Sequence, residues 1–477
     1  MAADDLCYIS AAEALALFRK KKLSPVELMK AVIKRAEKTE PKVNALPIRR
    51  FDEALAEAKE AEAVYMKRGA EPRSLEGIPL AVKDETLIEG TRTTFGSLIY
   101  KDSIDKETNP SIERVLGAGA IMHARSAAPE FSCAPYTHSR IHGITRTPWN
   151  LDYAPGGSSG GAGASLAAGS TTLANGSDIG GSIRIPASMS GVVGYKPPFG
   201  RNPDSAPFNL DQYCHVGPMA RSVLDCALLQ NVMAGPHPKD IVSLRPKVTV
   251  PTAFKAIKGW KIAVSLDLDA YDVDPDVVEN TLKAVQVFRD LGCKVEEVKL
   301  GWKREEIAKA GRAHFGTIFG PWIQRYAETH ADIMTDYALA FAADSKGVTH
   351  ADFVEGLEIE GRMYASLGPI LESHRLLLCP TLPLPSVKAG ESYVTTPVVI
   401  NGKPQRSIED WLMTMCFNMM SRCPVLALPS GLAQTGVPTG LSLVGRTYDD
   451  ATVFHAGAAY EAAVGGFYTA PKKRPKL

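Results

Sequence analysis

Apolar positions recur with helical spacing through the first part of the chain. Apolar residues repeat every three or four positions at Leu28, Met29, Val32, Ile33 and Ala36. The segment 24–27, SPVE, precedes this repeat and has the form of a capping box with proline at the first helical position. A second amphipathic pattern predicts a helix over 51–67. We therefore expect residues from about 1 to 70 to form a helical scaffold.

From about residue 75 onward, short apolar runs alternate with helical patterns. Runs of strand character stand at 78–82, 120–124, 260–265, 294–300, 376–379, 425–428 and 441–444. Helical patterns stand at 111–118, 222–234, 275–291, 449–464 and through most of 303–375. This alternation favours an α/β fold. Because the chain shows no repeat, heptad pattern or low-complexity linker, we expect one continuous domain over 1–477.

Composition narrows the class of protein. The 477 residues are 45% hydrophobic and 22% charged, with a net charge of +1. This balance indicates neither a nucleic-acid partner nor binding to an anionic membrane surface. No apolar run approaches the roughly 20 residues of a membrane span, and the start, MAADDLCYIS, lacks the apolar core of a secretory signal. We expect a soluble, cytoplasmic protein.

The cysteines and histidines lack the spacing of metal sites. Eight cysteines are scattered along the chain, mostly among apolar residues, and none forms a CxxC pair. In a cytoplasmic protein this distribution is typical of reduced core thiols. We therefore expect no metal and no cofactor.

The stretch from Ala154 to Lys196 holds two serines framed by glycines. Ser158 lies in GGSSGG and Ser182 lies in DIGGSIR. Glycine permits positive φ and close approach of the backbone, so we expect two loops that face one site. The segment 163–174 between them is rich in alanine and predicts a helix.

Lys83 ends the apolar run GIPLAVKD. Burial disfavours the charged form of a lysine, so a lysine at the end of a buried strand is unusual. Two interpretations are open at this point. Either Lys83 forms a structural ion pair with Asp84 or Glu85, or it is kept neutral for chemistry.

Other motifs are weaker. Residues 156–160 match the G-x-S-x-G nucleophile elbow, but that elbow needs a strand directly before it, and 152–155 is poor strand material. The segment 103–106 matches S-x-x-K without the partner motifs of penicillin-binding enzymes. No phosphate-binding glycine motif occurs in the chain.

Together these segments resemble the amidase signature family. The likeness is carried by GIPLAVKD, APGGSSGGAGASLAAG, SDIGGSIRIPASMSGVVGYKP and GVPTGLSLVGRTYDD, and it extends along essentially the whole chain. The resemblance implies an α/β/α fold, with a large mixed central β-sheet covered by helices on both faces. The signature core would span about 75–235, and the substrate pocket with its cover about 300–415.

The resemblance also implies a Ser–cis-Ser–Lys triad. Ser182 would be the nucleophile, and Ser158, which follows a cis peptide bond after Gly157, would connect it to the general base Lys83. A base that works near pH 7–8 needs a pKa roughly three units below the lysine reference of about 10.4. Burial supplies this shift, and a pair of serines offers no counter-charge to oppose it.

An oxyanion hole is expected beside the nucleophile. Four backbone N–H groups would form it, those of Ile179, Gly180, Gly181 and Ser182. We expect Asp178 and Arg184, which flank this loop, to pair and hold its shape, and Ser159 to form hydrogen bonds within the site.

The sequence says less about the substrate than about the catalytic residues. Ile185 stands three positions after Ser182, where family members place a residue that lines the substrate, and its apolar side chain favours a neutral acyl group. Ser132 and Cys133 are candidates for a second wall. Aromatic candidates for the pocket mouth are Phe315, Phe319, Trp322, Tyr326 and Trp411, although most of them are expected in the core.

The resemblance extends to the class of substrate. Members of the family also cleave anilides, esters and carbamates, so a urethanase-like activity belongs to what the resemblance implies. The expected partner is a small-molecule amide or carbamate. We expect a monomer or homodimer to cleave it.

Two other functions are open. The glutaminase subunit of tRNA-dependent amidotransferase complexes has similar length and the same triad, but usually carries threonine and glutamine where this chain has Ile179 and Ile185. The other is a binding protein on this fold without catalysis. The intact set Lys83, Ser158 and Ser182 argues against that interpretation.

Overall fold

A mixed β-sheet forms the centre of the molecule. The computed structural model describes residues 3–477, and within them eleven strands join in the order β1-β3-β2-β6-β8-β7-β14-β15-β11-β9-β10. Their bounds are β1 (Ile48–Arg49), β2 (Pro79–Lys83), β3 (Ile121–Ser126), β6 (Leu173–Asp178), β7 (Val193–Lys196), β8 (His215–Ala220), β9 (Lys261–Val264), β10 (Lys294–Glu297), β11 (Leu376–Pro380), β14 (Val425–Leu432) and β15 (Pro438–Gly445). Strands β3, β2 and β6 run parallel, as do β11, β9 and β10, and the pairs between these groups are antiparallel.

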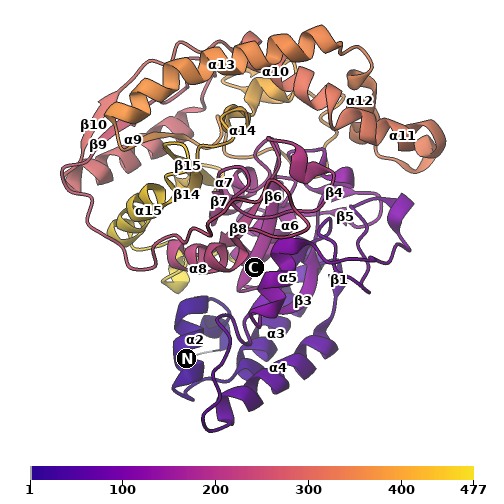
Figure 1. Ribbon diagram of the computed structural model, residues 1–477, viewed down its shortest axis with the longest axis vertical. Helices are drawn as coiled ribbons and strands as arrows, with labels where there is room; N and C mark the ends of the chain where they lie inside the picture. Colours follow the sequence, from indigo (N-terminus) through magenta and orange to yellow (C-terminus); the bar gives the residue numbers. More distant parts are fainter. Residues whose placement is uncertain (1–2) are drawn as a thin grey trace.

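Helices cover both faces of this sheet (Figure 1). The helices are α1 (Ala3–Leu6), α2 (Ala11–Arg19), α3 (Pro25–Val43), α4 (Phe51–Met66), α5 (Pro110–Gly117), α6 (Gly160–Ala168), α7 (Arg184–Ser190), α8 (Val223–Met233), α9 (Pro275–Asp290), α10 (Arg304–Thr317), α11 (Gly320–His330), α12 (Asp336–Ser345), α13 (His350–Ser373), α14 (Cys416–Met419) and α15 (Asp450–Val464). Helices α8, α9 and α15 pack against large aliphatic side chains on one face of the sheet. Helices α6 and α7 pack on the other face. This architecture confirms the predicted α/β/α fold with a mixed central sheet.

Small side chains line the face of the sheet that lies under α6. The strand residues that face this helix are Ala81, Ala124, Ala174, Met219 and Ala427. Helix α6 itself reads GGAGASLAA, and a Cβ at Gly161 would overlap the backbone of Ala127. Small residues on both sides let the helix approach the sheet closely. The loop that precedes α6 is thereby brought down onto the ends of β2 and β6.

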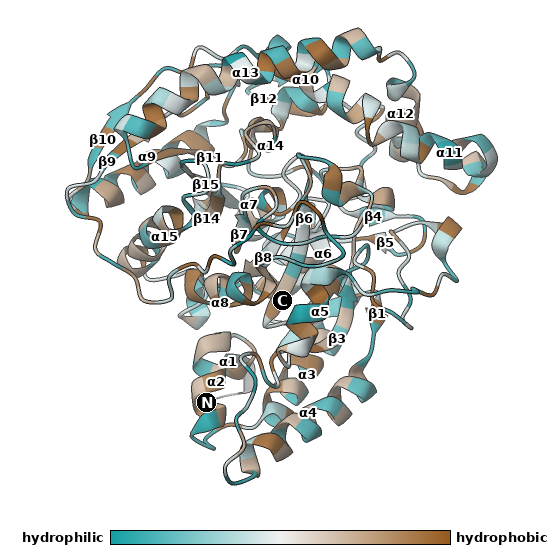
Figure 2. Ribbon diagram, in the orientation of Figure 1, coloured by the Kyte–Doolittle hydropathy of each residue, from teal (hydrophilic) through white to brown (hydrophobic). Residues whose placement is uncertain are grey.

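A second layer of helices covers the far end of the sheet, at the top of Figure 1. Helices α10 and α13 pack against each other, α12 and α11 continue this layer to the right edge of the view in Figure 1, and α14 lies nearer the centre. On α13 the buried residues Ile359, Met363 and Leu367 repeat at helical spacing. Figure 2 shows the same alternation of hydrophobic and hydrophilic residues along α10 and α13.

The predicted helix at 163–174 is wrong at its second half. Helix α6 ends at Ala168, where Gly169 adopts a left-handed conformation with φ 76° and caps the helix. Strand β6 then begins at Leu173. The alanine-rich composition favours helix by local propensity, but pairing of β6 with β2 and β8 overrides that preference.

Most other predicted elements are confirmed with small shifts at their ends, including β2, β3, β9, β10, β11, β14 and β15 and helices α4, α5, α8, α9 and α15. Strands β6, β7 and β8 are not predicted by the pattern. Their sequences LANGSD, VGYK and HVGPMA contain glycine, asparagine and proline, which strands usually avoid.

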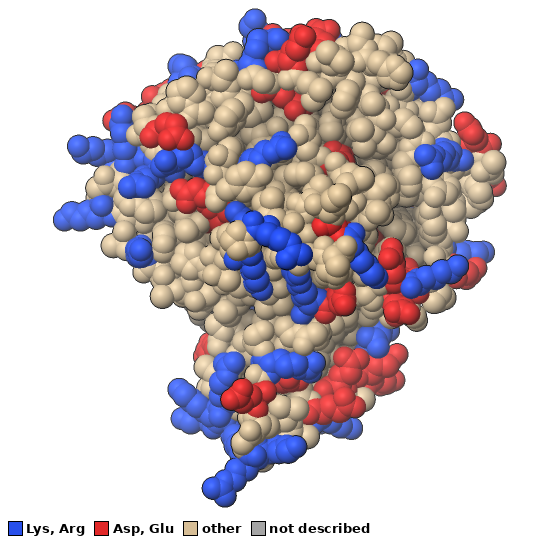
Figure 3. Space-filling model, in the orientation of Figure 1, with Lys and Arg blue, Asp and Glu red and all other residues tan. Residues whose placement is uncertain are grey.

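The surface agrees with the near-neutral composition. Figure 3 shows lysine and arginine interspersed with aspartate and glutamate over the face in view. Within residues 3–477 no helix is long and apolar enough to cross a membrane. Met1 and Ala2, which begin the segment considered as a secretory signal, lie outside the described residues.

Candidate active site

Lys83 lies at the carboxyl end of β2 and is fully buried. Its Nζ donates to Ser158 Oγ at 2.7 Å and to Ser177 Oγ at 2.8 Å. Its backbone N–H donates to Asn175 Oδ1 at 3.0 Å, which fixes the end of β2 to β6. Burial lowers the pKa of Lys83 from its ordinary value. A lysine in this setting is prepared to lose its proton and act as a base.

A carboxylate opposes this shift, contrary to the expectation that serines alone surround the amine. Glu85 Oε1 lies 3.1 Å from Lys83 Nζ, and the charge of Glu85 raises the pKa of Lys83 against the effect of burial. Ser132 Oγ donates to the other oxygen of Glu85. Asp84 points away and accepts from the backbone N–H of Thr94 at 2.9 Å. The two interpretations of Lys83 therefore coexist, because it contacts both the serines and one carboxylate.

The first glycine-serine loop places Ser158 against this lysine. The peptide bond between Gly157 and Ser158 is cis. A Cβ at Gly157 would lie 2.5 Å from the backbone nitrogen of Tyr136, so only glycine fits there. Ser158 is buried and stands just before α6, where the helix packs down on the sheet.

The second loop, 178–182, is held by a buried ion pair. Arg184 Nη2 donates to Asp178 Oδ1 at 2.7 Å, and Arg184 Nε donates to Asp178 Oδ2 at 2.9 Å. Asn418 Nδ2 adds a bond of 2.8 Å to Asp178 Oδ1. Burial alone would raise the pKa of Asp178, but the guanidinium and these hydrogen bonds hold it well below its usual range. The pair fixes both ends of the loop.

The backbone of this loop presents free N–H groups. Within residues 3–477 no acceptor receives a hydrogen bond from the four consecutive amides, those of Ile179, Gly180, Gly181 and Ser182. Gly181 has φ +132°, and a Cβ there would overlap the Thr414 hydroxyl. Thr414 Oγ1 donates to the carbonyl of Gly180 at 2.7 Å, which turns that carbonyl away from the site. Unpaired donors of this kind are suited to a negatively charged oxygen.

Ser182 lies beside these amides, and its side chain is nearly buried. The two loops are joined through Ser159, whose N–H donates to the Ser182 carbonyl at 3.1 Å. Ser159 Oγ also accepts from the Ser177 N–H at 3.3 Å. In the described part of the chain Ser182 Oγ has no hydrogen-bond partner, so the expected contact between Ser158 and Ser182 is not formed in this state.

Two cavities meet at the serines. The first, here called the Ser182 cavity, has a volume of about 430 Å³ and is lined by Ser182 and Gly180. The predicted substrate-binding residues Ser132, Cys133 and Ile185 all line it. Its other walls carry apolar and aromatic side chains, from Phe315, Phe319, Tyr337, Phe341 and Leu412, and four charged ones, from Arg312, Asp344, Arg406 and Glu409.

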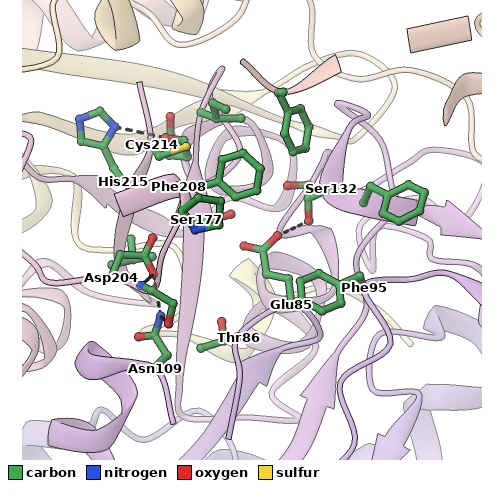
Figure 4. A pocket seen from close by; sticks show the side chains of 18 of the residues that line it. Glu85, Thr86, Phe95, Asn109, Ser132, Ser177, Asp204, Phe208, Cys214 and His215 are labelled. Atoms are coloured by element: carbon green, nitrogen blue, oxygen red, sulfur yellow. Dashed lines mark hydrogen bonds between the residues drawn. The ribbon is translucent and has the colours of Figure 1, made fainter. Parts of the chain in front are cut away.

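The second, here called the Ser158 cavity, has a volume of about 190 Å³. Figure 4 shows Glu85 and Ser132 hydrogen-bonded on one side, with Asp204 and Asn109 on the other and Phe208 above. Ser158 and Ser177 lie between these two sides. Three residues line both cavities, namely Ser132, Ile179 and Phe319.

The aromatic candidates divide between the cavities and the core. Phe315 lines the Ser182 cavity, Phe319 lines both, and Trp322 lines the Ser158 cavity. Trp411 is buried in the core, and Tyr326 stacks on Phe131 at 5.4 Å between ring centroids.

Several residues of the site were not identified from the sequence. Ser177 shares the Lys83 amine with Ser158, and Thr414 and Asn418 support the second loop from more than 200 residues away. Ser177 lies only five positions before Ser182, which is the one signal that could have found it. Among the described residues no cluster of three or more His, Cys, Asp or Glu side chains is arranged to hold a metal ion.

A family model, curated relatives and a solved structure that resemble this chain agree with one another. The Amidase family model matches residues 27–454. An acylamidase from Rhodococcus erythropolis is 31% identical over 97% of both chains. A glutamyl-tRNA(Gln) amidotransferase subunit from Moorella thermoacetica is 32% identical over 99% of both. The structure of a bacterial aryl acylamidase superposes with a TM-score of 0.88 at 28% identity, over 96% of both chains.

Proposed function

Because this chain belongs to the amidase family, we propose that it hydrolyses C–N bonds of small-molecule amides through an acyl intermediate on Ser182. One observation carries the proposal. The buried amine of Lys83 donates to Ser158 Oγ at 2.7 Å, on the loop that contacts Ser182 and its four unpaired N–H groups. This arrangement supports the assignment of Lys83 as the base, Ser158 as the relay and Ser182 as the nucleophile, next to the amides that would hold the oxyanion.

In the proposed reaction Ser182 Oγ attacks the carbonyl carbon of the amide. The Ser182 proton passes to Ser158 Oγ as the Ser158 proton passes to neutral Lys83 Nζ. The carbonyl oxygen becomes an oxyanion and accepts hydrogen bonds from the unpaired amides of the loop. When the C–N bond breaks, the leaving nitrogen takes its proton from the Lys83 ammonium through Ser158. Water then repeats the attack on the acyl-serine and releases the acid.

Ser182 must contact Ser158 for the first transfer. Ser158 lines one of the two adjoining cavities and Ser182 lines the other. Catalytic hydrogen bonds are commonly formed only when substrate is bound. We therefore assign this contact to the substrate complex.

The part of the Ser182 cavity that lies next to Gly180 and Gly181 favours a neutral acyl group. Ile185 and Phe315 are apolar and lie in the same cavity as the nucleophile. Similarity to an acylamidase and to an aryl acylamidase supports anilides as substrates. Esters and carbamates present the same carbonyl to Ser182, so we include a urethanase-like reaction in the proposal.

The test is release of 4-nitroaniline from anilides of neutral short-chain and aryl acids. Ser182→Ala and Lys83→Ala are expected to lower kcat on the order of 10⁴-fold or more. Ser188→Ala is the matched control, because Ser188 is a buried serine on α7 whose hydroxyl has no hydrogen bond. Mass spectrometry of the wild type during turnover should show the acyl group on the peptide that contains Ser182. Full activity of Ser182→Ala would overturn the assignment of the nucleophile.

A glutaminase subunit is the second candidate, favoured by the 32% identity to the amidotransferase protein of Moorella thermoacetica. In this case the purified chain would need a partner chain and would release ammonia from glutamine. Ammonia release from glutamine, with no turnover of any anilide, would replace the first proposal with this one. Size-exclusion chromatography tests the accompanying prediction that the chain works as a monomer or homodimer.

A further inference from the structure

Two carboxylates give the Ser158 cavity its negative charge: Glu85, whose other neighbour is the Lys83 amine at 3.1 Å, and Asp204, which the proposed reaction does not use. Glu85 and Asp204 both line it, and among the described residues that line it there is no lysine or arginine. Asp178 also borders the cavity, but its charge is balanced by Arg184. His215 and Cys214 complete the set of titratable groups. Burial lowers the pKa of His215 to about 3 and raises the pKa of the Cys214 thiol, so neither adds charge near neutral pH.

Asp204 lies across the cavity from Glu85 (Figure 4). Its Oδ1 accepts from Asn109 Nδ2 at 2.6 Å and from the Ser205 N–H at 2.8 Å. Its Oδ2 has no hydrogen-bond partner within residues 3–477. Burial raises the pKa of Asp204 to about 6, which leaves the carboxyl ionised at pH 8. An ionised carboxylate oxygen without a donor from the protein, in a cavity lined by a second carboxylate, favours a ligand that brings its own donor.

Aromatic rings form the remaining wall of this cavity. Phe208 contacts Trp322 with ring centroids 5.4 Å apart and Phe319 at 5.3 Å. Phe131 contacts Trp322 at 5.4 Å, and Phe95 lies 6.5 Å from the same indole. All five rings line the cavity. Aromatic faces attract ammonium groups, and carboxylates beside them do so as well.

The positions of Ser158 and Ser182 indicate which half of the substrate enters the Ser158 cavity. Ser182 and Gly180 line the other cavity and do not line this one, so the proposed reaction places the carbonyl and acyl group there. Ser158, which passes a proton to the leaving nitrogen, lines this one. The nitrogen side of the scissile bond therefore faces Glu85, Asp204 and the rings.

We propose that the Ser158 cavity is a leaving-group subsite selective for amines that carry a second, cationic group, such as the monoacyl derivative of a short diamine. The inference rests on the proposed function, since it assigns the amine half of the same substrate. A cation of this kind donates hydrogen bonds to Asp204 Oδ2 and lies against the aromatic wall. A carboxylate in the same place would meet the like charge of Asp204, and the Lys83 amine nearby is already paired with Glu85.

The test compares three amides that share one acyl group. N-benzoyl-1,3-diaminopropane is cationic, N-benzoylbutylamine is neutral and of similar length, and N-benzoyl-β-alanine is anionic. At pH 8 we expect kcat/KM for the cationic amide to exceed that for the neutral amide about tenfold, with the anionic amide slowest. Asp204→Asn should reduce the ratio of cationic to neutral kcat/KM several-fold. Glu89→Gln, an exposed carboxylate outside the cavity, is the control and should leave the ratio unchanged.

The ratio within one variant is independent of how much enzyme is correctly folded. Turnover of the neutral amide with no preference for the cation overturns this inference and leaves the proposed function intact. Absence of turnover of all three overturns the proposed function instead. In that event calorimetry of the same three amides with Ser182→Ala decides the subsite, and equal affinity for all three overturns it.

Discussion

Replacing Glu85 by glutamine is expected to move the acid side of the pH–rate profile to lower pH. Lys83 acts only when neutral, so activity rises as pH passes upward through its pKa. Glu85 stabilises the ammonium form at a distance of 3.1 Å, and its charge raises the pKa of Lys83. Glutamine keeps the shape and a hydrogen-bonding oxygen but removes the charge. The neutral lysine therefore forms at lower pH in the variant.

The size of the expected pH shift follows from the distance between Glu85 Oε1 and Lys83 Nζ. Coulomb's law gives about 1.3 kcal/mol for unit charges 3.1 Å apart in bulk water and about 5 kcal/mol at an effective dielectric constant of about 20. Glu85 is mostly buried and borders a cavity, so the interaction lies between these limits. One pKa unit corresponds to about 1.36 kcal/mol. A shift of at least about one pH unit is therefore expected.

The assay is kcat/KM for a neutral anilide measured across pH, because this profile reports groups in the free enzyme. A neutral leaving group keeps substrate charge out of the comparison. Glu89→Gln serves as the control, with the same chemical change on an exposed residue. An acid limb that stays in place or moves to higher pH in Glu85→Gln would refute the assignment of Lys83 as the titrating base or of Glu85 as its charge partner.

Three other substitutions test the support of the site. Gly181→Ala places a methyl group against Thr414 and should lower kcat about 10²–10³-fold, whereas Gly361→Ala, in open space on α13, should leave kcat unchanged. Lys83→Met should abolish turnover and lower stability less than Arg184→Met does, because methionine removes the cost of burying an amine but leaves the partly exposed Glu85 without its charge partner; a loss of stability as large as that of Arg184→Met would contradict this. Arg184→Met leaves the buried Asp178 carboxylate unpaired and should cost about 3–5 kcal/mol of stability, measured by chemical denaturation; a stability equal to the wild type would show that the pair is not needed.

Local patterns predicted the elements whose residues share one periodicity. Strand β2 has apolar residues and a terminal lysine, and α9 has a regular apolar stripe, so both are predicted to within a few residues. Strand β6, LANGSD, carries no such signal, because its conformation comes from pairing with β2 and β8. The alanine-rich segment before it therefore suggested a helix that continues too far.

The residues of the candidate site also fall into those that the sequence identifies and those that only the fold brings together. Glycine-framed serines are visible in the sequence because glycine is needed where backbones approach closely. The sequence could not distinguish Asp84 from Glu85 as the neighbour of Lys83, since strand alternation ends at Lys83 and a turn follows. The sequence could not identify Thr414 as a site residue, because Thr414 contacts Gly180 only through the packing of segments that are 234 residues apart.

The two cavities on either side of the serines have a consequence for what the acyl-enzyme does next. Once the first amine departs, the acyl group stays in the Ser182 cavity and the Ser158 cavity is open to a new molecule beside the base. Water entering there completes hydrolysis. An amine entering there retraces the cleavage step and forms a different amide. In the proposed reaction the walls of the Ser158 cavity govern the choice between these two fates. Apart from Ser132, Ile179 and Phe319, those walls are separate from the walls of the Ser182 cavity, so most substitutions in one cavity would change the acceptor or the acyl group but not both.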